Sequence, residues 1–187
     1  MQERLKPTLW RTCRALASKQ RLNLIRLLDE HEELTVSQAA NKTGRPLSGV
    51  SEDLRILNAR GLLKVRRKGL YVHYRIGADS SISGADTLVK ALKDLLHAAP
   101  DRQAAALKAL TGFTHVRRHK IIYELHQAPA SFGQLVLRCH ISAPSLKRHI
   151  RKLRDRGFVK LEKHIYHLAT PTDPLRRYLL SAASKPP

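Results

Sequence analysis

Two stretches of the chain have apolar residues at helical spacing, followed in each case by an arginine and a glycine. The first holds Val50, Leu54 and Leu57 before Arg60-Gly61, and the second holds Leu146, Ile150 and Leu153 before Arg156-Gly157. Spacing of i, i+4 and i+7 buries one face of a helix. Because the two glycines stand 96 positions apart (157 minus 61), the pattern predicts two similar modules in one chain.

Helices and one sharp turn dominate the first half of the chain. Apolar periodicity predicts two helices within residues 8–29 that meet near residues 18–20, a short helix over 36–42 and a longer one over 47–60. The turn Thr43-Gly44-Arg45-Pro46 separates the last two, since glycine adopts left-handed dihedrals and proline starts a helix readily. This order of elements is a helix-turn-helix.

A β-hairpin is expected after the longer helix. Strands are predicted over 63–67 and 70–76, closed by the basic tip Arg66-Arg67-Lys68-Gly69. A hairpin in this position is a wing. A helix over 86–98 closes the module, and the acidic run over 29–33 is interpreted as a solvated turn.

The second half repeats this plan. Phe113, Arg118 and Ile122 align with Leu16, Arg21 and Ile25. Ser142 is expected to cap a helix over 143–156, strands follow at 159–161 and 165–168, and a helix over 173–183 ends the module. The second hairpin is shorter and lacks the glycine, so a reduced wing is expected.

These elements predict an α+β fold class, mainly α with small β-hairpins, built as tandem winged helix-turn-helix domains. Ala99-Pro100-Asp101 is the clearest interruption between the modules. We therefore place one domain at residues 1–98 and the other at residues 99–187.

Several short motifs in residues 9–98 occur in the order and spacing of a known family. They are Ala15-Leu16-Ala17, Arg21-Leu22, Leu34-Thr35-Val36-Ser37-Gln38, Ser48-x-Val50-Ser51-x2-Leu54-x2-Leu57, Gly61-Leu62 and Gly69-x2-Val72-x-Tyr74-Arg75-Ile76. They resemble the winged-helix repressors of the ArsR family, and the second module looks like a degenerate copy of the same type. The resemblance implies a prokaryotic transcription regulator whose recognition helix enters the major groove, while the wing touches the backbone or the minor groove.

The charge of the chain favours a polyanion as partner. It carries 35 Lys+Arg against 15 Asp+Glu, a formal net charge of +20 on 187 residues. Together with the helix-turn-helix order, this charge favours double-stranded DNA. No run of about 18 apolar residues occurs, so no membrane partner is expected. The two cysteines, Cys13 and Cys139, suit a reducing cytosol, and a cytoplasmic, nucleoid-associated protein is expected.

The predicted reading helix of the second module is strongly basic. Residues 143–156 carry six cations against Asp155, a net charge of +5. With the apolar positions turned inward, these cations can face phosphates, and arginine can pair bidentately with guanine. We assign DNA contacts in this module to Ser145, Lys147, Arg148, Arg151, Lys152 and Arg154.

The matching helix of the first module is neutral. Residues 47–60 carry Arg55 and Arg60 against Glu52 and Asp53, and these carboxylates are expected to repel phosphates. The wing is expected to supply the anchoring charge instead. We assign DNA contacts in this module to Ser48, Ser51, Arg55, Arg66, Arg67 and Lys68.

Two arrangements on DNA stay open. The favoured one is a monomeric pseudo-dimer, in which one chain presents two reading helices to successive major grooves about 34 Å apart. Its DNA site is asymmetric, because the two helices differ. The alternative is a homodimer formed through the first module.

Metal and cofactor chemistry finds little support. Thr35 and Ser37 occupy the positions of the family's Cys-x-Cys metal site, and neither is a soft ligand. Asp86, Asp94 and His97 reproduce the family's other metal site poorly. We therefore expect no metal and no cofactor.

His115 and His119 have the i, i+4 spacing of zinc ligands, but no third ligand accompanies them, and they are interpreted as lying on the surface or near phosphates.

No enzyme activity is expected, because the chain has no phosphate-cradling glycine loop, no Gly-x-Ser-x-Gly elbow and no carboxylate cluster. The remaining alternatives to a regulator are a replication initiator, an architectural nucleoid protein that binds DNA without reading sequence, and a module whose first reading helix docks a protein.

Overall fold

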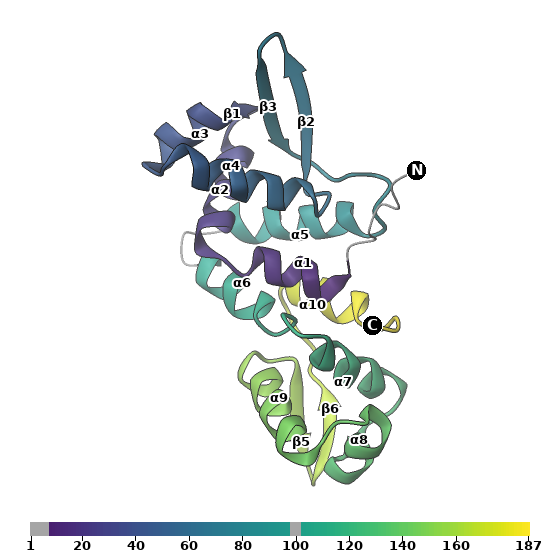
Figure 1. The fold of residues 1–187 in the computed structure, drawn as a ribbon. Helices are drawn as coiled ribbons and strands as arrows, with labels where there is room; N and C mark the ends of the chain where they lie inside the picture. Colours follow the sequence, from purple (N-terminus) through teal and green to yellow (C-terminus); the bar gives the residue numbers. More distant parts are fainter. Residues whose placement is uncertain (1–7, 98–101) are drawn as a thin grey trace. The chain divides into compact units, whose positions relative to one another are not determined.

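The computed structural model describes residues 8–97 and 102–187, which divide into two compact units (Figure 1). Of the described residues, unit 1 contains 15–97 and 102–107, and unit 2 contains 8–14 and 108–187. Two helices, α1 (Leu9–Leu16) and α6 (Arg102–Leu110), therefore contribute residues to both units. The predicted domain boundary between residues 98 and 99, with the interruption at 99–101, lies outside the described residues.

Unit 1 contains a helix-turn-helix followed by a hairpin, as the apolar pattern predicts. Its further helices are α2 (Lys19–Glu30), α3 (Val36–Thr43), α4 (Leu47–Asn58) and α5 (Ala85–His97), and its strands are β1 (Leu34–Thr35), β2 (Leu63–Lys68) and β3 (Tyr71–Ile76). The strands form an antiparallel sheet in the order β1-β3-β2, so the wing has a third strand that the sequence did not indicate. In Figure 1 the β2–β3 hairpin extends beyond the helices of its unit.

Unit 2 repeats this order with a shorter hairpin. Its further elements are α7 (Val116–Gln127), β4 (Ala130–Ser131), α8 (Phe132–Cys139), α9 (Ala143–Asp155), β5 (Val159–Glu162), β6 (Ile165–Leu168) and α10 (Pro174–Ala182). The sheet order β4-β6-β5 is the counterpart of β1-β3-β2. The α+β winged-helix fold class is thereby confirmed.

Matching side chains start and stop the first helix of each helix-turn-helix. Thr35 and Ser131 each accept a hydrogen bond from the backbone of a glutamine three residues on, and that glutamine side chain returns a bond to the backbone of the cap. Left-handed residues, Gly44 (φ 63°) and His140 (φ 51°), end these helices. The expectation that Ser142 caps α9 is wrong in one respect, because its side chain makes no cap hydrogen bond although it stands at the cap position.

The predicted apolar faces of α4 and α9 lie in the cores of the two units. Val50, Leu54 and Leu57 are buried, and so are Leu146, Ile150 and Leu153. In unit 2, the rings of Phe113 and Phe158 also meet edge to face, with centroids 4.9 Å apart.

The glycine that follows α4 is required by its surroundings. Gly61 has φ +69°, and a Cβ at this position would collide with Ile82. The conformation allows the chain to turn from α4 into β2.

A partly buried arginine links two helices of unit 1. Arg21 Nε donates to the carbonyl oxygen of Ala15, and its Nη1 lies 3.0 Å from Asp53 Oδ1. Arg45 Nη2 lies 2.7 Å from the other oxygen, Asp53 Oδ2. The side chain of Asp53 is only 10% exposed. The expectation that Asp53 repels phosphates is therefore wrong, since its carboxylate lies on the inner face of α4 and is held by two guanidinium groups.

The acidic run over 29–33 is more structured than the predicted solvated turn. Helix α2 continues to Glu30, and the side chain of Asp29 is 7% exposed and lies 2.7 Å from Lys93 Nζ of α5. Glu33 forms an ion pair with Lys68 of the wing. The run therefore connects α2 to two other elements of the unit.

We predict that Asp53→Ala lowers the free energy of unfolding of unit 1 by about 2–3 kcal/mol, because it leaves two partly buried guanidinium groups without their carboxylate. Chemical denaturation followed by circular dichroism measures the loss. The matched control is Glu52→Ala, which removes an exposed carboxylate from the same helix and should leave the free energy of unfolding nearly unchanged. Equal losses for the two variants would contradict the structural role of Asp53.

Candidate nucleic-acid interface

The outer face of α9 in unit 2 presents a group of exposed cations. Its members Lys147, Arg148, Arg151 and Arg154 follow one another at spacings of one, three and three residues, so they share a broad stripe of the helix. All four are exposed, and among the described residues no ion pair engages them. The structure thus brings together four of the six candidates of this module with their charges uncompensated.

The other two candidates of this module are less available. Lys152 is half-buried, and burial together with the nearby charges of Arg118 and Arg156 lowers its pKa. Ser145 accepts a hydrogen bond of 3.0 Å from Arg117 Nη1. Arg117 is an exposed cation of α7 that the sequence did not single out, and its bond to Ser145 places it beside the start of α9.

The outer face of α4 in unit 1 carries much less free charge. Ser48 and Ser51 are exposed. Arg55 is exposed as well, but its guanidinium holds both carboxylate oxygens of Glu52 at 2.9 and 2.8 Å. This ion pair lowers the pKa of Glu52 and raises that of Arg55. Helix α4 therefore offers two hydroxyls and a neutralised arginine.

The basic residues of the first wing lie on its strands rather than at its tip. Strand β2 extends through Lys68, so the turn consists of Gly69 and Leu70, and the predicted basic tip is corrected to that extent. Successive residues of a strand point to opposite faces. Arg66 and Lys68 therefore share one face, while Arg67 lies on the other.

Two further cations lie on the same face as Arg66. Lys64 pairs with Arg75 across the hairpin, and Arg66 pairs with His73. Lys64 and Arg75 are not among the DNA contacts predicted from the sequence, although the alternation of basic residues along the two strands could have revealed them.

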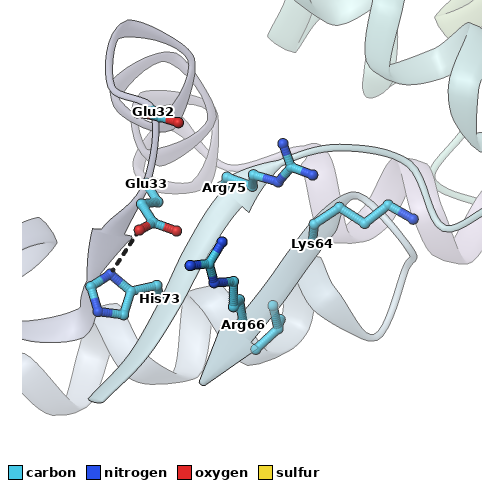
Figure 2. Close-up of a pocket in the computed structure, with 7 residues that line it drawn as sticks. Glu32, Glu33, Lys64, Arg66, His73 and Arg75 are labelled. Carbon is cyan, nitrogen blue, oxygen red and sulfur yellow. Dashed lines mark ion pairs between the residues drawn. The ribbon is translucent and has the colours of Figure 1, made fainter. Parts of the chain in front are cut away.

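This face of the wing contains a cavity of about 410 Å³ (Figure 2). Lys64, Arg66 and Arg75 line it opposite Glu32 and Glu33. Glu33 also lies 3.7 Å from His73 Nδ1, and the hydrogen bond that Lys68 donates to Glu33 lowers the pKa of that carboxyl. Lys68 is therefore neutralised by Glu33, which leaves Lys64, Arg66, Arg67 and Arg75 to give the wing its positive charge.

The second wing differs in both length and charge. Lys160 lies 2.7 Å from Glu162 on the same strand. Its turn consists of Lys163 and His164, both with positive φ, in place of the glycine of the first wing. The reduced wing that the sequence predicted is present and close to neutral.

The residues considered for metal binding have other roles or form no site. Thr35 is the cap of α3, and within residues 8–97 and 102–187 no group of three His, Cys, Asp or Glu side chains could hold a metal ion. His119 is not on the surface as expected, because it is buried and its Nε2 lies 3.0 Å from the carbonyl oxygen of Lys185. His115 Nδ1 accepts the backbone N–H of Arg117 at the start of α7. Cys13 and Cys139 are buried free thiols.

Comparison with known proteins matches the two halves to different families. Residues 115–160, from the start of α7 into β5, match the model of bacterial regulatory proteins of the arsR family. Residues 16–76 match another family model, which carries only the description HVO_A0114. No curated protein matches the chain. The ArsR resemblance is thus found in the second module, and for the first module it stays a prediction.

The arsR match indicates DNA binding and transcription regulation, with DNA as the partner. Among the described residues, no helix combines the length and the apolar character needed to cross a membrane.

We predict that Lys64→Ala makes the negative slope of log affinity against log salt concentration shallower by about 1 and weakens binding equally on all DNA sequences, as expected for a lost phosphate contact. The matched control is Lys160→Ala at the equivalent position of the second wing, where Glu162 already neutralises the cation. Fluorescence anisotropy with duplex DNA at several salt concentrations measures both slopes. If Lys160→Ala changed the salt slope as much as Lys64→Ala or more, the proposed difference in free positive charge between the two wings would be contradicted.

Proposed function

We propose that this chain is a transcriptional repressor that binds one asymmetric site on double-stranded DNA through two non-identical winged-helix modules. The observation that carries the proposal is the distribution of uncompensated cations on two matching scaffolds. In unit 2 they lie on the outer face of α9, and in unit 1 they lie on the wing. The arsR match to residues 115–160 supports DNA binding by the second module.

In this proposal unit 2 reads bases. Arg148 and Arg151 are exposed on the outer face of α9, and a guanidinium can pair with O6 and N7 of guanine in the major groove. Lys147 and Arg154 at the borders of the stripe contact phosphates, and Ser145 contacts the backbone or a base edge near the helix start.

Unit 1 contributes mainly phosphate contacts. Arg66 and Arg67 supply them from the wing, together with Lys64 and Arg75, and Lys68 contributes less because Glu33 holds its ammonium group. Ser48, Ser51 and Arg55 of α4 face the groove with little net charge, because Glu52 neutralises Arg55. The wing is therefore the stronger anchor of this unit.

We infer that a single chain of 21.2 kDa binds the site as a pseudo-dimer, because it already presents two modules. Repression follows from occupancy, since a protein that fills the grooves of a promoter excludes the polymerase from the same base pairs.

The test is selection of bound sequences from random duplexes, followed by affinity measurements at several salt concentrations. Recovery of one asymmetric motif is the expected result. A palindromic motif would support the homodimer instead. An architectural protein would give no enriched motif and would bind all duplexes with a steep salt dependence. Failure to bind any duplex at low salt would refute the proposal.

Substitutions in the two reading helices test the asymmetry between the units. We predict that Arg148→Ala and Arg151→Ala each reduce affinity for the selected site by about 1–3 kcal/mol and relax its sequence preference. Arg55→Ala should cost less, because that guanidinium is already held by Glu52. Anisotropy titrations on the selected site and on point variants of it measure both effects. Equal losses for all three variants would contradict the division of roles.

A further inference from the structure

Units 1 and 2 share a structural arginine but differ in the residue that faces it. Arg21 of α2 corresponds to Arg118 of α7, and each donates from Nε to a backbone carbonyl just ahead of its helix, that of Ala15 or of Gly112. On the facing helix, the position of Asp53 in α4 corresponds to His149 in α9. The carboxylate that neutralises the arginine in unit 1 is therefore absent from unit 2.

Arg118 is left with neutral partners. It is 5% exposed, and it donates to the carbonyl of Gly112 at 2.6 Å, to Thr114 Oγ1 at 2.6 Å and to the carbonyl of Thr111 at 3.3 Å. Among the described residues no carboxylate pairs with it. Burial and the nearby charge of Arg156 lower the pKa of Arg118, as expected for a cation without a counter-charge.

His149 presents an unused donor beside this cation. The imidazole is 4% exposed, and its Nδ1 lies 3.5 Å from Arg118 Nη1. Because arginine can only donate, Nδ1 acts as the acceptor, and the neutral ring carries its proton on Nε2. Nε2 is buried and has no hydrogen-bond partner among the described residues. A buried donor of this kind is costly unless a ligand or an ordered water molecule accepts its hydrogen bond.

The two side chains line a cavity of about 420 Å³ whose walls are mostly cationic. Arg148, Arg151 and Lys152 contribute further cations, and Asp155 is the one carboxylate in the lining described by the structure. The ring of His115 stands against that of His149, with centroids 4.8 Å apart. Burial, followed by the charges around it, lowers the pKa of His149 to about 4, so the ring is neutral near pH 7. The volume lies within the range of small-ligand sites.

We propose that unit 2 binds a phosphate-type oxyanion in this cavity, in the role that the Asp53 carboxylate has in unit 1. The anion accepts hydrogen bonds from Arg118 Nη1 and from His149 Nε2, while Arg148, Arg151 or Lys152 supplies charge at the mouth. Charge-assisted bonds of this kind are the stronger ones in proteins. The occupant is either a free phosphate or a phosphate group of the DNA backbone, and the two sources share the same chemistry.

Inorganic phosphate is the first probe, titrated into the full chain at constant ionic strength with chloride as the compensating ion. The readouts are the NMR signals of the Arg118 guanidinium and the His149 ring, together with the thermal unfolding midpoint. Saturable shifts at both residues and a rising midpoint are expected, since a ligand that binds only the folded state stabilises it. The phosphate titration does not require DNA binding, so a failure of this proposal can be distinguished from a failure of the proposed function.

Three variants test the role of His149 in the phosphate titration. His149→Asp restores the arrangement of unit 1, so it should raise the unfolding midpoint without phosphate and weaken phosphate binding by roughly a factor of ten or more. His149→Gln removes the imidazole without adding a charge and should weaken binding less than His149→Asp. The control His164→Asp makes the same change in the turn of the second wing, outside the cavity lining, and should leave the phosphate response unchanged.

The second arm uses duplex DNA in which one backbone phosphate at a time is replaced by a neutral methylphosphonate. If the occupant is a backbone phosphate, one replacement weakens binding by the wild type and has no effect on His149→Asp. If phosphate binds saturably but no methylphosphonate position weakens binding in this way, the occupant of the cavity is a free phosphate ion. Two results together would overturn the proposal: phosphate and chloride give the same NMR shifts, and every methylphosphonate changes the DNA affinity of the wild type and of His149→Asp equally.

Discussion

A guanidinium that links the inner face of the reading helix to an earlier helix, α2 or α7, is the interaction on which each unit depends. Arg21 and Arg118 both bond to a carbonyl ahead of their own helix and reach toward the facing helix, α4 or α9. The contact lies on the same side of the reading helix as its buried apolar residues, and the remaining residues face outward. The outward face can then change without affecting the scaffold.

The two units use that freedom in opposite ways. On α9 the outer cations have no partner among the described residues, whereas on α4 the one outer arginine is held by Glu52. The wings show the reverse, since β2 and β3 carry several uncompensated cations and β5 has Lys160 paired with Glu162. The two units thus have matching backbones but carry their uncompensated cations on different elements, the wing in unit 1 and α9 in unit 2. A DNA duplex bound by both units would contact two different surfaces. This difference underlies the proposed asymmetric site.

The sequence predicted the helices and hairpins well because burial imposes a period on apolar residues. Val50, Leu54 and Leu57 are buried as their spacing required, and the bounds of α4 differ by two residues at its end. Strand β1 has two residues, too few for an alternation to be visible. The inward orientation of Asp53 depends on Arg21, 32 residues away, and periodicity alone does not reveal such a contact. For the same reason, the sequence showed His149 only as one of ten scattered histidines.

The exchange of aspartate for histidine at the inner position has an electrostatic consequence for the outer face. In unit 1, Asp53 neutralises part of the charge of Arg21 and Arg45, and this reduces the positive potential around α4. In unit 2, Arg118 lies beneath the outer cations of α9 with no carboxylate partner among the described residues, and its field adds to theirs. An anion held by Arg118 would weaken that field, and Arg148 and Arg151, which line the cavity, are also the proposed readers of DNA. Occupation of the cavity by a free anion and DNA binding by α9 are therefore expected to oppose each other, whereas a backbone phosphate in the same place would strengthen the complex.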